Sequence, residues 1–331
     1  MVGMTEIEPL RIGVCGVGTV GLATINILQN QSSLVAARCG REVRVTHVGA
    51  RRDHPDHNYG DAKVSRDVMD VARDPDVDVV VELIGGTTVA HEVMKIAIEH
   101  GKHVVTANKA LIAEHGNQLI PLAEASGVQL CFEAAVAGGI PVIKSVREAL
   151  AGHAVSEVAG IINGTANCIL TEMCNKGRAC EEVLLEAQAL GYAEADPTFD
   201  VDGTDAAHKL VILASLAFGT PLSIDAPAKQ GIQALTPEDL DYAKTLGYRV
   251  KHLGIARRTG GRIEMRVHPT LIPETKQLAG IDGVLNAITV KADAVGELLL
   301  VGPGAGGSAT ASSVCADVID IARDHGAAGY P

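Results

Sequence analysis

The order of strand-like and helix-like segments in the first half of the chain constrains the fold most strongly. From Leu10 onward, short runs rich in β-branched residues alternate with segments of helical length. The runs predicted as strands are LRIGVC, VRVTHV, VDVVVELI, HVVTA and VQLCFEAA. Strands joined by right-handed helical crossovers form an open parallel sheet with helices on both faces. The pattern therefore predicts a doubly wound, Rossmann-type α/β domain over residues 1–145.

The whole chain has 331 residues, which is long enough for two domains. Its second half has a less regular pattern than the first. Strands are predicted at 155–165 and in IEMRVHPTLI and AITVKA, and helices at 181–190 and 205–218. This mixture favours an α+β domain over 146–303. In the last segment, 304–331, the apolar spacing of SSVCADVIDIARDH predicts a helix that packs back on the first domain. A flexible tail is the alternative.

Composition excludes several classes of function. The chain is 47% hydrophobic with no Trp and three Phe, as expected for a Val-, Ile-, Leu- and Ala-rich core around a covered parallel sheet. A formal charge of −12 without a basic run argues against nucleic acids and anionic membranes as partners. Neither an export signal nor a run of ~20 apolar residues is found, so we expect a cytoplasmic protein. Seven cysteines without a C-x-x-C pair favour reduced thiols.

A glycine motif directly after the first predicted strand indicates a dinucleotide site. Residues Gly16-Val17-Gly18-Thr19-Val20-Gly21 match G-x-G-x-x-G in the strand-turn-helix context that gives this motif its meaning. The first glycine permits a tight turn, the second lets a pyrophosphate approach, and the third lets helix and strand pack closely. The helix N-terminus then offers free N–H groups to the phosphates.

The end of the second predicted strand bears on which dinucleotide binds. The run VRVTHV is followed by Gly49-Ala50-Arg51-Arg52. NAD-selective enzymes usually place Asp or Glu at this tip, whereas Arg51 and Arg52 suit a 2′-phosphate. NADP(H) is therefore favoured. NAD(H) stays possible if both arginines are solvated and Asp53 binds the ribose.

Two further strand ends face the crevice in which such sheets bind ligands. They are Leu83-Ile84-Gly85-Gly86 and Thr106-Ala107-Asn108-Lys109, and they make Gly85 and Lys109 site candidates. Lys109 could be an ordinary surface lysine, but a cation at a helix start opposes the helix dipole, which favours a functional reason. The stretch Gly302–Gly307 lacks the Gly-Lys-Ser/Thr of a P-loop, so a kinase or ATPase is excluded.

An acidic segment precedes a single lysine at the start of an apolar run. Its carboxylates are Glu194, Asp196, Asp200, Asp202 and Asp205, followed by Lys209. The first four are predicted in a loop, and Asp205 and Lys209 one turn apart on a buried helix. The alternative is an ordinary i,i+4 ion pair worth about 0.2–0.5 kcal/mol. The segment favours binding of a small cationic group beside one proton donor.

Together these residues resemble the homoserine dehydrogenase family, over nearly the whole length of the chain. The resemblance depends on GVGTVG, ELIGG, TANKALIA, EAAVAGGIP, INGTANCIL, GYAEADPTFDVDG, DAAHK and GPGAGG. It implies interconversion of L-aspartate 4-semialdehyde and L-homoserine with NAD(P)H, in threonine and methionine biosynthesis. It also implies that the second domain binds substrate and forms a homodimer.

The resemblance also implies roles for single residues. Lys209 would exchange a proton with the substrate C4 oxygen, aided by Asp205, and Lys109 would contact cofactor and substrate. Glu194 would bind the α-ammonium group. The remaining pocket residues would be Asp200, Gly164, Thr165 and Tyr192, and further cofactor contacts would come from Gly191 and Gly306.

Two other implications concern a cation and regulation. The loop EAAVAGGIP implies a Na⁺ or K⁺ site, with the Glu133 carboxylate and the carbonyls of Val136, Gly138 and Ile140 as ligands. Many relatives continue into a small regulatory ACT domain, whereas this sequence stops at Pro331. We therefore expect no threonine feedback inhibition through such a domain.

Other functions remain open at this point. One alternative is another NADP-linked amino-acid or aldehyde reductase on the same scaffold, and another is a non-catalytic dinucleotide sensor. An acylating aldehyde dehydrogenase needs an activated cysteine at the crevice, whereas we expect Cys131 and Cys168 to be buried rather than activated, which argues against that class.

Overall fold

A computed structural model describes residues 8–52, 57–189 and 197–323. The chain forms two compact units. Unit 1 comprises the residues up to Gly139 together with the segment that starts at Gly306, and unit 2 comprises Ile140–Ala305. Within the described residues, none of the helices combines the length and the apolar character that crossing a membrane requires.

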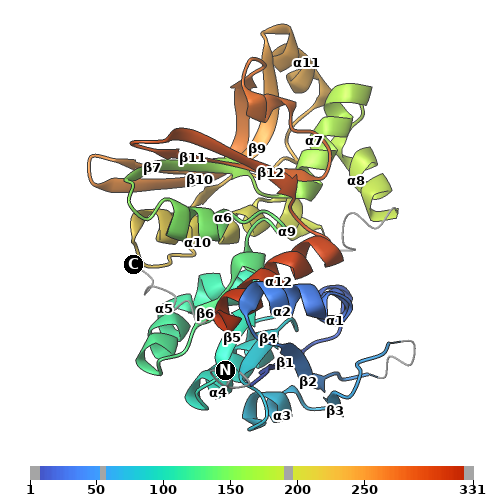
Figure 1. Cartoon of the computed structure of the whole chain (residues 1–331). Coiled ribbons are helices and arrows are strands. Elements are labelled where there is room, and N and C mark those ends of the chain that lie inside the picture. The colour runs from blue at the N-terminus through green and yellow to red at the C-terminus, as the bar shows by residue number, and fades with distance from the viewer. Residues whose placement is uncertain (1–7, 53–56, 190–196, 324–331) are drawn as a thin grey trace. The chain divides into compact units, whose positions relative to one another are not determined.

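Unit 1 is built on a six-stranded parallel sheet in the order β3-β2-β1-β4-β5-β6 (Figure 1). The strands are β1 (Leu10–Cys15), β2 (Val43–Gly49), β3 (Lys63–Ser65), β4 (Val79–Glu82), β5 (His103–Thr106) and β6 (Leu130–Cys131). The order reverses between β1 and β4, which is the switch point of a doubly wound sheet. The predicted Rossmann-type fold is therefore confirmed.

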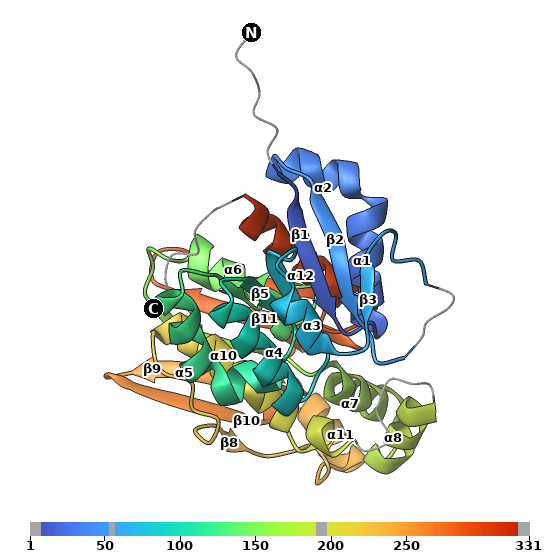
Figure 2. The ribbon, with the colours of Figure 1, turned by 90° about the horizontal axis from the view of Figure 1, so that it is seen from below.

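Helices cover both faces of this sheet. They are α1 (Thr19–Asn30), α2 (Ser32–Cys39), α3 (Val68–Arg73), α4 (Thr88–Glu99), α5 (Lys109–Ala125), the short η1 (Glu133–Ala135) and α12 (Gly307–Ala322). Helices α1, α2 and α12 share one buried apolar cluster with β1 and β2, while α3 and α4 pack from the other side (Figure 2). Val314 and Val318 of α12 are fully buried in that cluster. A segment from the far end of the chain thus completes the core of unit 1.

Unit 2 contains a six-stranded mixed sheet in the order β12-β11-β7-β9-β10-β8. Its strands are β7 (Val155–Ile161), β8 (Ala228–Lys229), β9 (Tyr248–Thr259), β10 (Arg262–Pro273), β11 (Leu285–Ala292) and β12 (Gly296–Pro303). Only β8 and β10 pair in parallel among these described strands. Helix α10 (Thr204–Phe218) packs on β7, β9 and β10. This arrangement confirms the predicted α+β class.

The remaining elements of unit 2 are mostly short. They are α6 (Val142–Lys144), η2 (Ser145–Ala149), α7 (Gly164–Lys176), α8 (Cys180–Ala189), α9 (Thr198–Val201), α11 (Pro237–Thr245) and η3 (Gln277–Gly280).

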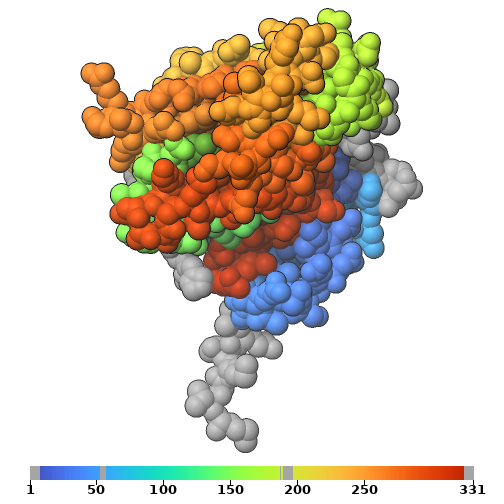
Figure 3. Space-filling view, turned by 90° about the horizontal axis from the view of Figure 1, so that it is seen from above, coloured from blue at the N-terminus to red at the C-terminus, as the bar shows by residue number. Residues whose placement is uncertain are grey.

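Figure 3 looks onto the side of unit 2 where residues of the β9–β12 region, in orange and red, form much of the surface. On the sheet face away from α10, Leu285 and Val301 are exposed.

Three predicted strands are clearly shorter than expected. The run VDVVVELI contributes only Val79–Glu82 to the sheet. The strand predicted over 155–165 ends at Ile161, because the side chain of Asn163 accepts a 2.7 Å hydrogen bond from the backbone N–H of Ala166 and caps α7. The run VQLCFEAA contributes only Leu130–Cys131 to the sheet, since η1 begins at Glu133. The cap at Asn163 shows how a polar side chain at a strand end starts a helix that apolar patterning does not reveal.

Candidate functional site

The glycine motif after β1 has the geometry of a dinucleotide cradle. Gly16 has a φ of +98°, and a Cβ there would lie 2.6 Å from the carbonyl oxygen of Leu83. A Cβ on Gly21 would collide with the carbonyl oxygen of Gly16. Gly18 has no neighbouring heavy atom within 4 Å of the Cβ position, so a ligand can approach its backbone. The chain at this turn therefore fits a pyrophosphate.

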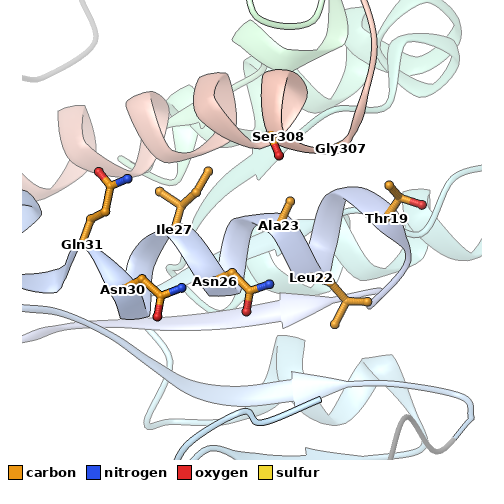
Figure 4. A pocket seen from close by; sticks show the side chains of 9 residues that line it. All are labelled: Thr19, Leu22, Ala23, Asn26, Ile27, Asn30, Gln31, Gly307 and Ser308. Carbon is orange, nitrogen blue, oxygen red and sulfur yellow. The ribbon is translucent and has the colours of Figure 1, made fainter. Parts of the chain in front are cut away.

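The N-terminus of α12 lies beside the N-terminus of α1, and both helices begin in glycine-containing turns. A groove runs between them, lined by Thr19, Leu22, Ala23, Asn26, Ile27, Asn30, Gln31, Gly307 and Ser308 (Figure 4). Gly306, predicted to contact the cofactor, is the N-cap of α12 with a φ of +113°. Two helix N-termini at one place favour a negatively charged ligand.

Three guanidinium groups belong to the region around the β2 tip. Arg51 and Arg52 follow β2 and are exposed, as a 2′-phosphate contact requires. Arg66, which the sequence analysis missed, donates a 3.0 Å hydrogen bond to the carbonyl of Ala50. The signal that could have found it is its place directly after β3, the strand that pairs with β2. Asp53, the alternative ribose ligand, lies outside the described residues.

The lysine and aspartate predicted to share a helix face form a close ion pair on α10. The Nζ of Lys209 lies 2.7 Å from Oδ2 of Asp205, and both side chains are nearly buried. The same ammonium donates to the carbonyl oxygen of Ile162 at 2.8 Å. A lysine ammonium has three donors, so these two contacts fix its direction and leave one N–H for a ligand.

Asn163 connects this pair to a second carboxylate and was missed by the sequence analysis. Its amide nitrogen donates to Oδ1 of Asp200 at 2.7 Å and to Oδ2 of Asp205 at 2.8 Å. Asn163 is 5% exposed, so this bridge is shielded from water. Asn163 lies inside the run predicted as a strand, but an asparagine followed by a Gly-Thr step is a helix-start signal that could have found it.

The other predicted substrate residues divide into two groups. Gly164 and Thr165 form the first turn of α7, directly after Asn163. A Cβ on Gly164 would lie 2.7 Å from the carbonyl oxygen of Val284, so this position has no room for a side chain. The predicted substrate residues Tyr192 and Glu194 lie outside the described part of the chain, as does Gly191, which was predicted to contact the cofactor. Asp202 instead accepts hydrogen bonds from the N–H and the hydroxyl of Thr204, the first residue of α10.

The predicted cation loop carries hard oxygen donors. Glu133 is 2% exposed, and the loop after it turns through positive φ at Ala137 and Gly138. The carbonyl of Gly138 accepts a 2.6 Å hydrogen bond from Ser313 of α12 and keeps a second lone pair. Val136 follows η1 in unit 1, and Ile140 is the first residue of unit 2. Across the described residues, no group of three or more His, Cys, Asp or Glu side chains could hold a metal.

The cysteines with a resolved change in acidity are not activated nucleophiles. Burial raises the pKa of the thiols of Cys15, Cys168 and Cys180, and raises that of Cys315 to about 12. Cys131 is buried in β6. A nucleophilic cysteine needs a lowered pKa, so these thiols do not suit an acylating dehydrogenase.

Each unit supplies one feature of a nicotinamide-dinucleotide-dependent oxidoreductase: unit 1 has a dinucleotide cradle at the switch point of its parallel sheet, and unit 2 has a largely buried lysine held by an aspartate. Comparison with known proteins specifies the class further. A family model described as homoserine dehydrogenase matches residues 141–319, and one described as homoserine dehydrogenase, NAD binding domain, matches residues 16–133. The chain belongs to the homoserine dehydrogenase family.

Individual relatives agree with this assignment. The homoserine dehydrogenase of Pseudomonas aeruginosa is 57% identical over 96% of this chain and 73% of its own length. The one from Neisseria gonorrhoeae is 53% identical with the same coverage. A crystal structure of the Thiobacillus denitrificans enzyme has a TM-score of 0.93 at 51% identity, covering 98% of this chain and 75% of that one.

A more distant structure concerns the cofactor. A hyperthermophilic archaeal homoserine dehydrogenase in complex with NADPH has a TM-score of 0.79 at 28% identity, covering 95% of this chain and 97% of that one. These comparisons confirm the predicted family and a nicotinamide-dinucleotide-binding oxidoreductase of amino-acid biosynthesis.

Proposed function

We propose that this protein interconverts L-aspartate 4-semialdehyde and L-homoserine, with NADP(H) as the preferred cofactor. The observation that carries the proposal is Lys209, whose ammonium is held between Asp205 and the carbonyl of Ile162 with one N–H left for a substrate oxygen. Family membership supports the substrate pair.

The chemistry divides between cofactor and protein. When bound, the dinucleotide supplies or accepts a hydride at C4 of its nicotinamide. During reduction, negative charge grows on the aldehyde oxygen and Lys209 donates a proton to it. Asp205 accepts a hydrogen bond from the lysine and aims it. During oxidation the transfer reverses, and the amine of Lys209 takes the hydroxyl proton of homoserine.

The acidic segment would select an amino acid as the substrate. Asp200 is fixed by the amide of Asn163 and presents carboxylate oxygen for a cationic group. We assign the α-ammonium group of the substrate to Glu194, with Asp200, Gly164, Thr165 and Tyr192 around it. Lys109 at the start of α5 would contact both cofactor and substrate.

The preference for NADP(H) is supported by Arg51, Arg52 and Arg66, because guanidinium groups bind phosphate through paired hydrogen bonds. A bound Na⁺ or K⁺ would be held by the Glu133 carboxylate and the carbonyls of Val136, Gly138 and Ile140. Carboxylate and carbonyl oxygens are suitable ligands for a hard cation.

We also propose a cytoplasmic homodimer. Leu285 and Val301 are exposed apolar side chains on the sheet face away from α10, and a second copy could cover them. The seven cysteines are free thiols, as in a reducing compartment.

The proposal is tested by following NADPH absorbance with purified protein and aspartate semialdehyde. We expect NADPH consumption, and NADP⁺ reduction when homoserine is supplied. A panel of other aldehydes and amino acids separates this activity from that of a related reductase. NADPH binding without turnover of any of these substrates would contradict the proposal and favour a dinucleotide sensor.

A further inference from the structure

Glu82, the last residue of β4, is a completely buried carboxylate that the mechanism above does not use. Its Oε1 accepts hydrogen bonds from the backbone N–H groups of Ile84 at 2.7 Å and Gly85 at 3.3 Å. Its Oε2 accepts a 2.6 Å hydrogen bond from the hydroxyl of Thr106, its register partner in β5. A buried carboxylate is costly unless donors surround it, so this one needs a structural or functional reason.

The hydrogen-bond network continues from Thr106 into the first turn of α5. The hydroxyl oxygen of Thr106 accepts from the backbone N–H of Asn108 at 3.0 Å. The amide nitrogen of Asn108 donates to the carbonyl of Gly86 at 2.7 Å, and its amide oxygen accepts from the N–H of Leu111. The network therefore joins the loop after β4 to the N-cap of α5, whose first residue is Lys109.

Donors point at both carboxylate oxygens of Glu82, so both oxygens must act as hydrogen-bond acceptors. The N–H groups of Ile84 and Gly85 can only donate. The hydroxyl of Thr106 donates to Oε2 of Glu82, while its oxygen accepts from the N–H of Asn108. Burial raises the pKa of the Glu82 carboxyl, and these hydrogen bonds oppose that rise. Gly85 and Gly86 both have positive φ, so the loop has an uncommon conformation that the acceptor helps to hold.

We infer that Glu82 is a positioning residue of the dehydrogenase reaction, whose carboxylate fixes the Leu83–Gly86 loop and the first turn of α5 and thereby sets the place of Lys109. The inference rests on the proposed role of Lys109 toward cofactor and substrate. Glu82 itself acts through these neighbours, since its side chain is enclosed in the sheet.

The test compares variants inside the network with one outside it. Glu82→Gln places an amide N–H₂ group opposite a hydrogen-bond donor, so one hydrogen bond is lost. Thr106→Val removes the hydroxyl while keeping the shape of the side chain. We expect each to weaken NADPH binding about tenfold and to lower kcat, as expected for one lost hydrogen bond to a charged group. Thr106→Ser keeps the hydroxyl, so NADPH affinity and kcat should stay near the wild-type values.

The control is Val80→Ala, which removes buried side-chain volume on the same strand outside the network. We expect a lower Tm but unchanged NADPH affinity and kcat. If Val80→Ala lowered NADPH affinity and kcat as much as a network variant with the same loss of Tm, the inference would be overturned. The Thr106 variants test it even if Glu82→Gln does not fold.

A double variant tests whether Glu82 acts through Lys109. We expect Glu82→Gln to lower kcat in the wild type but much less in a Lys109→Ala background. Fully additive losses would overturn the inference. The NADPH-binding measurements use no substrate, so their outcome is separate from that of the proposed reaction.

Discussion

Gly307, the first residue of α12, touches Thr19, the first residue of α1, although 288 positions separate them in the chain. A Cβ on Gly307 would lie 2.7 Å from Cγ2 of Thr19 and 3.2 Å from its carbonyl oxygen. The two helix N-termini that flank the dinucleotide cradle are thus in direct contact because residue 307 has no side chain.

We predict that Gly307→Ala lowers the free energy of unfolding by about 1–3 kcal/mol, the usual cost of overpacking, and weakens NADPH binding. Thr19→Ser removes the methyl group that an alanine would strike, so the double variant should regain part of both losses. Denaturant unfolding and NADPH titration measure this. Full additivity of the two substitutions would show that this contact is not limiting.

Lys209→Ala should lower kcat by about 10² to 10⁴-fold, the usual contribution of a positioned proton donor. NADPH affinity should be retained, because the cradle belongs to unit 1 and Lys209 to unit 2. Lys244→Ala, an exposed lysine on α11, is the control. Near-normal turnover of the Lys209 variant would disprove its assigned role.

Asn163→Ala should lower kcat about tenfold or more, because two carboxylates each lose a hydrogen bond. Without that donor, Asp200 and Asp205 would be held less firmly, so the KM for homoserine should rise as well. Asn175→Ala, an exposed position near the end of α7, should leave kcat and KM unchanged. A lower Tm with unchanged kcat and KM in the Asn163 variant would argue for a helix-capping role alone.

Removing the arginines near β2 should change the choice of cofactor. We expect Arg51→Ala with Arg52→Ala, and separately Arg66→Ala, to raise the KM for NADPH by about tenfold and to leave the KM for NADH nearly constant. Arg44→Ala serves as the control, since Arg44 pairs with Glu42 on the surface. Equal changes in both KM values would indicate that these arginines do not contact a 2′-phosphate.

Stability should fall in mild acid because of a buried histidine. Burial lowers the pKa of His252. The hydrogen bond from its ring to the carbonyl of Gln230 opposes this effect but is the smaller of the two. The folded state then holds the neutral ring, while the unfolded chain takes up a proton below about pH 6.5. Stability is thus lost as the pH falls below that value, by at most about 1.4 kcal/mol per pH unit for this group.

The pH dependence of Tm should become shallower in His252→Asn, while His100→Gln on the surface serves as the comparison. His47 is also buried, with its pKa lowered by burial, so part of the dependence should persist in the His252 variant. A slope that is identical in wild type and His252→Asn would contradict the assignment.

The sequence alone determined the class of fold. It also indicated that the dinucleotide site lies at the carboxyl ends of the parallel strands. Period and length of apolar runs decide strand and helix locally, and G-x-G-x-x-G needs only its immediate neighbours to form its turn. The i,i+4 spacing of Asp205 and Lys209 likewise sets their contact within one helix.

Only the tertiary structure showed the contacts between residues far apart in the chain. Asn163 reaches Asp200 and Asp205, and Thr106 reaches Glu82. No local pattern encodes these contacts, because a side chain's hydrogen-bond partner depends on which elements become neighbours. Sequence periodicity reports which face of an element is buried, whereas the identity of what covers that face is decided when the whole chain packs.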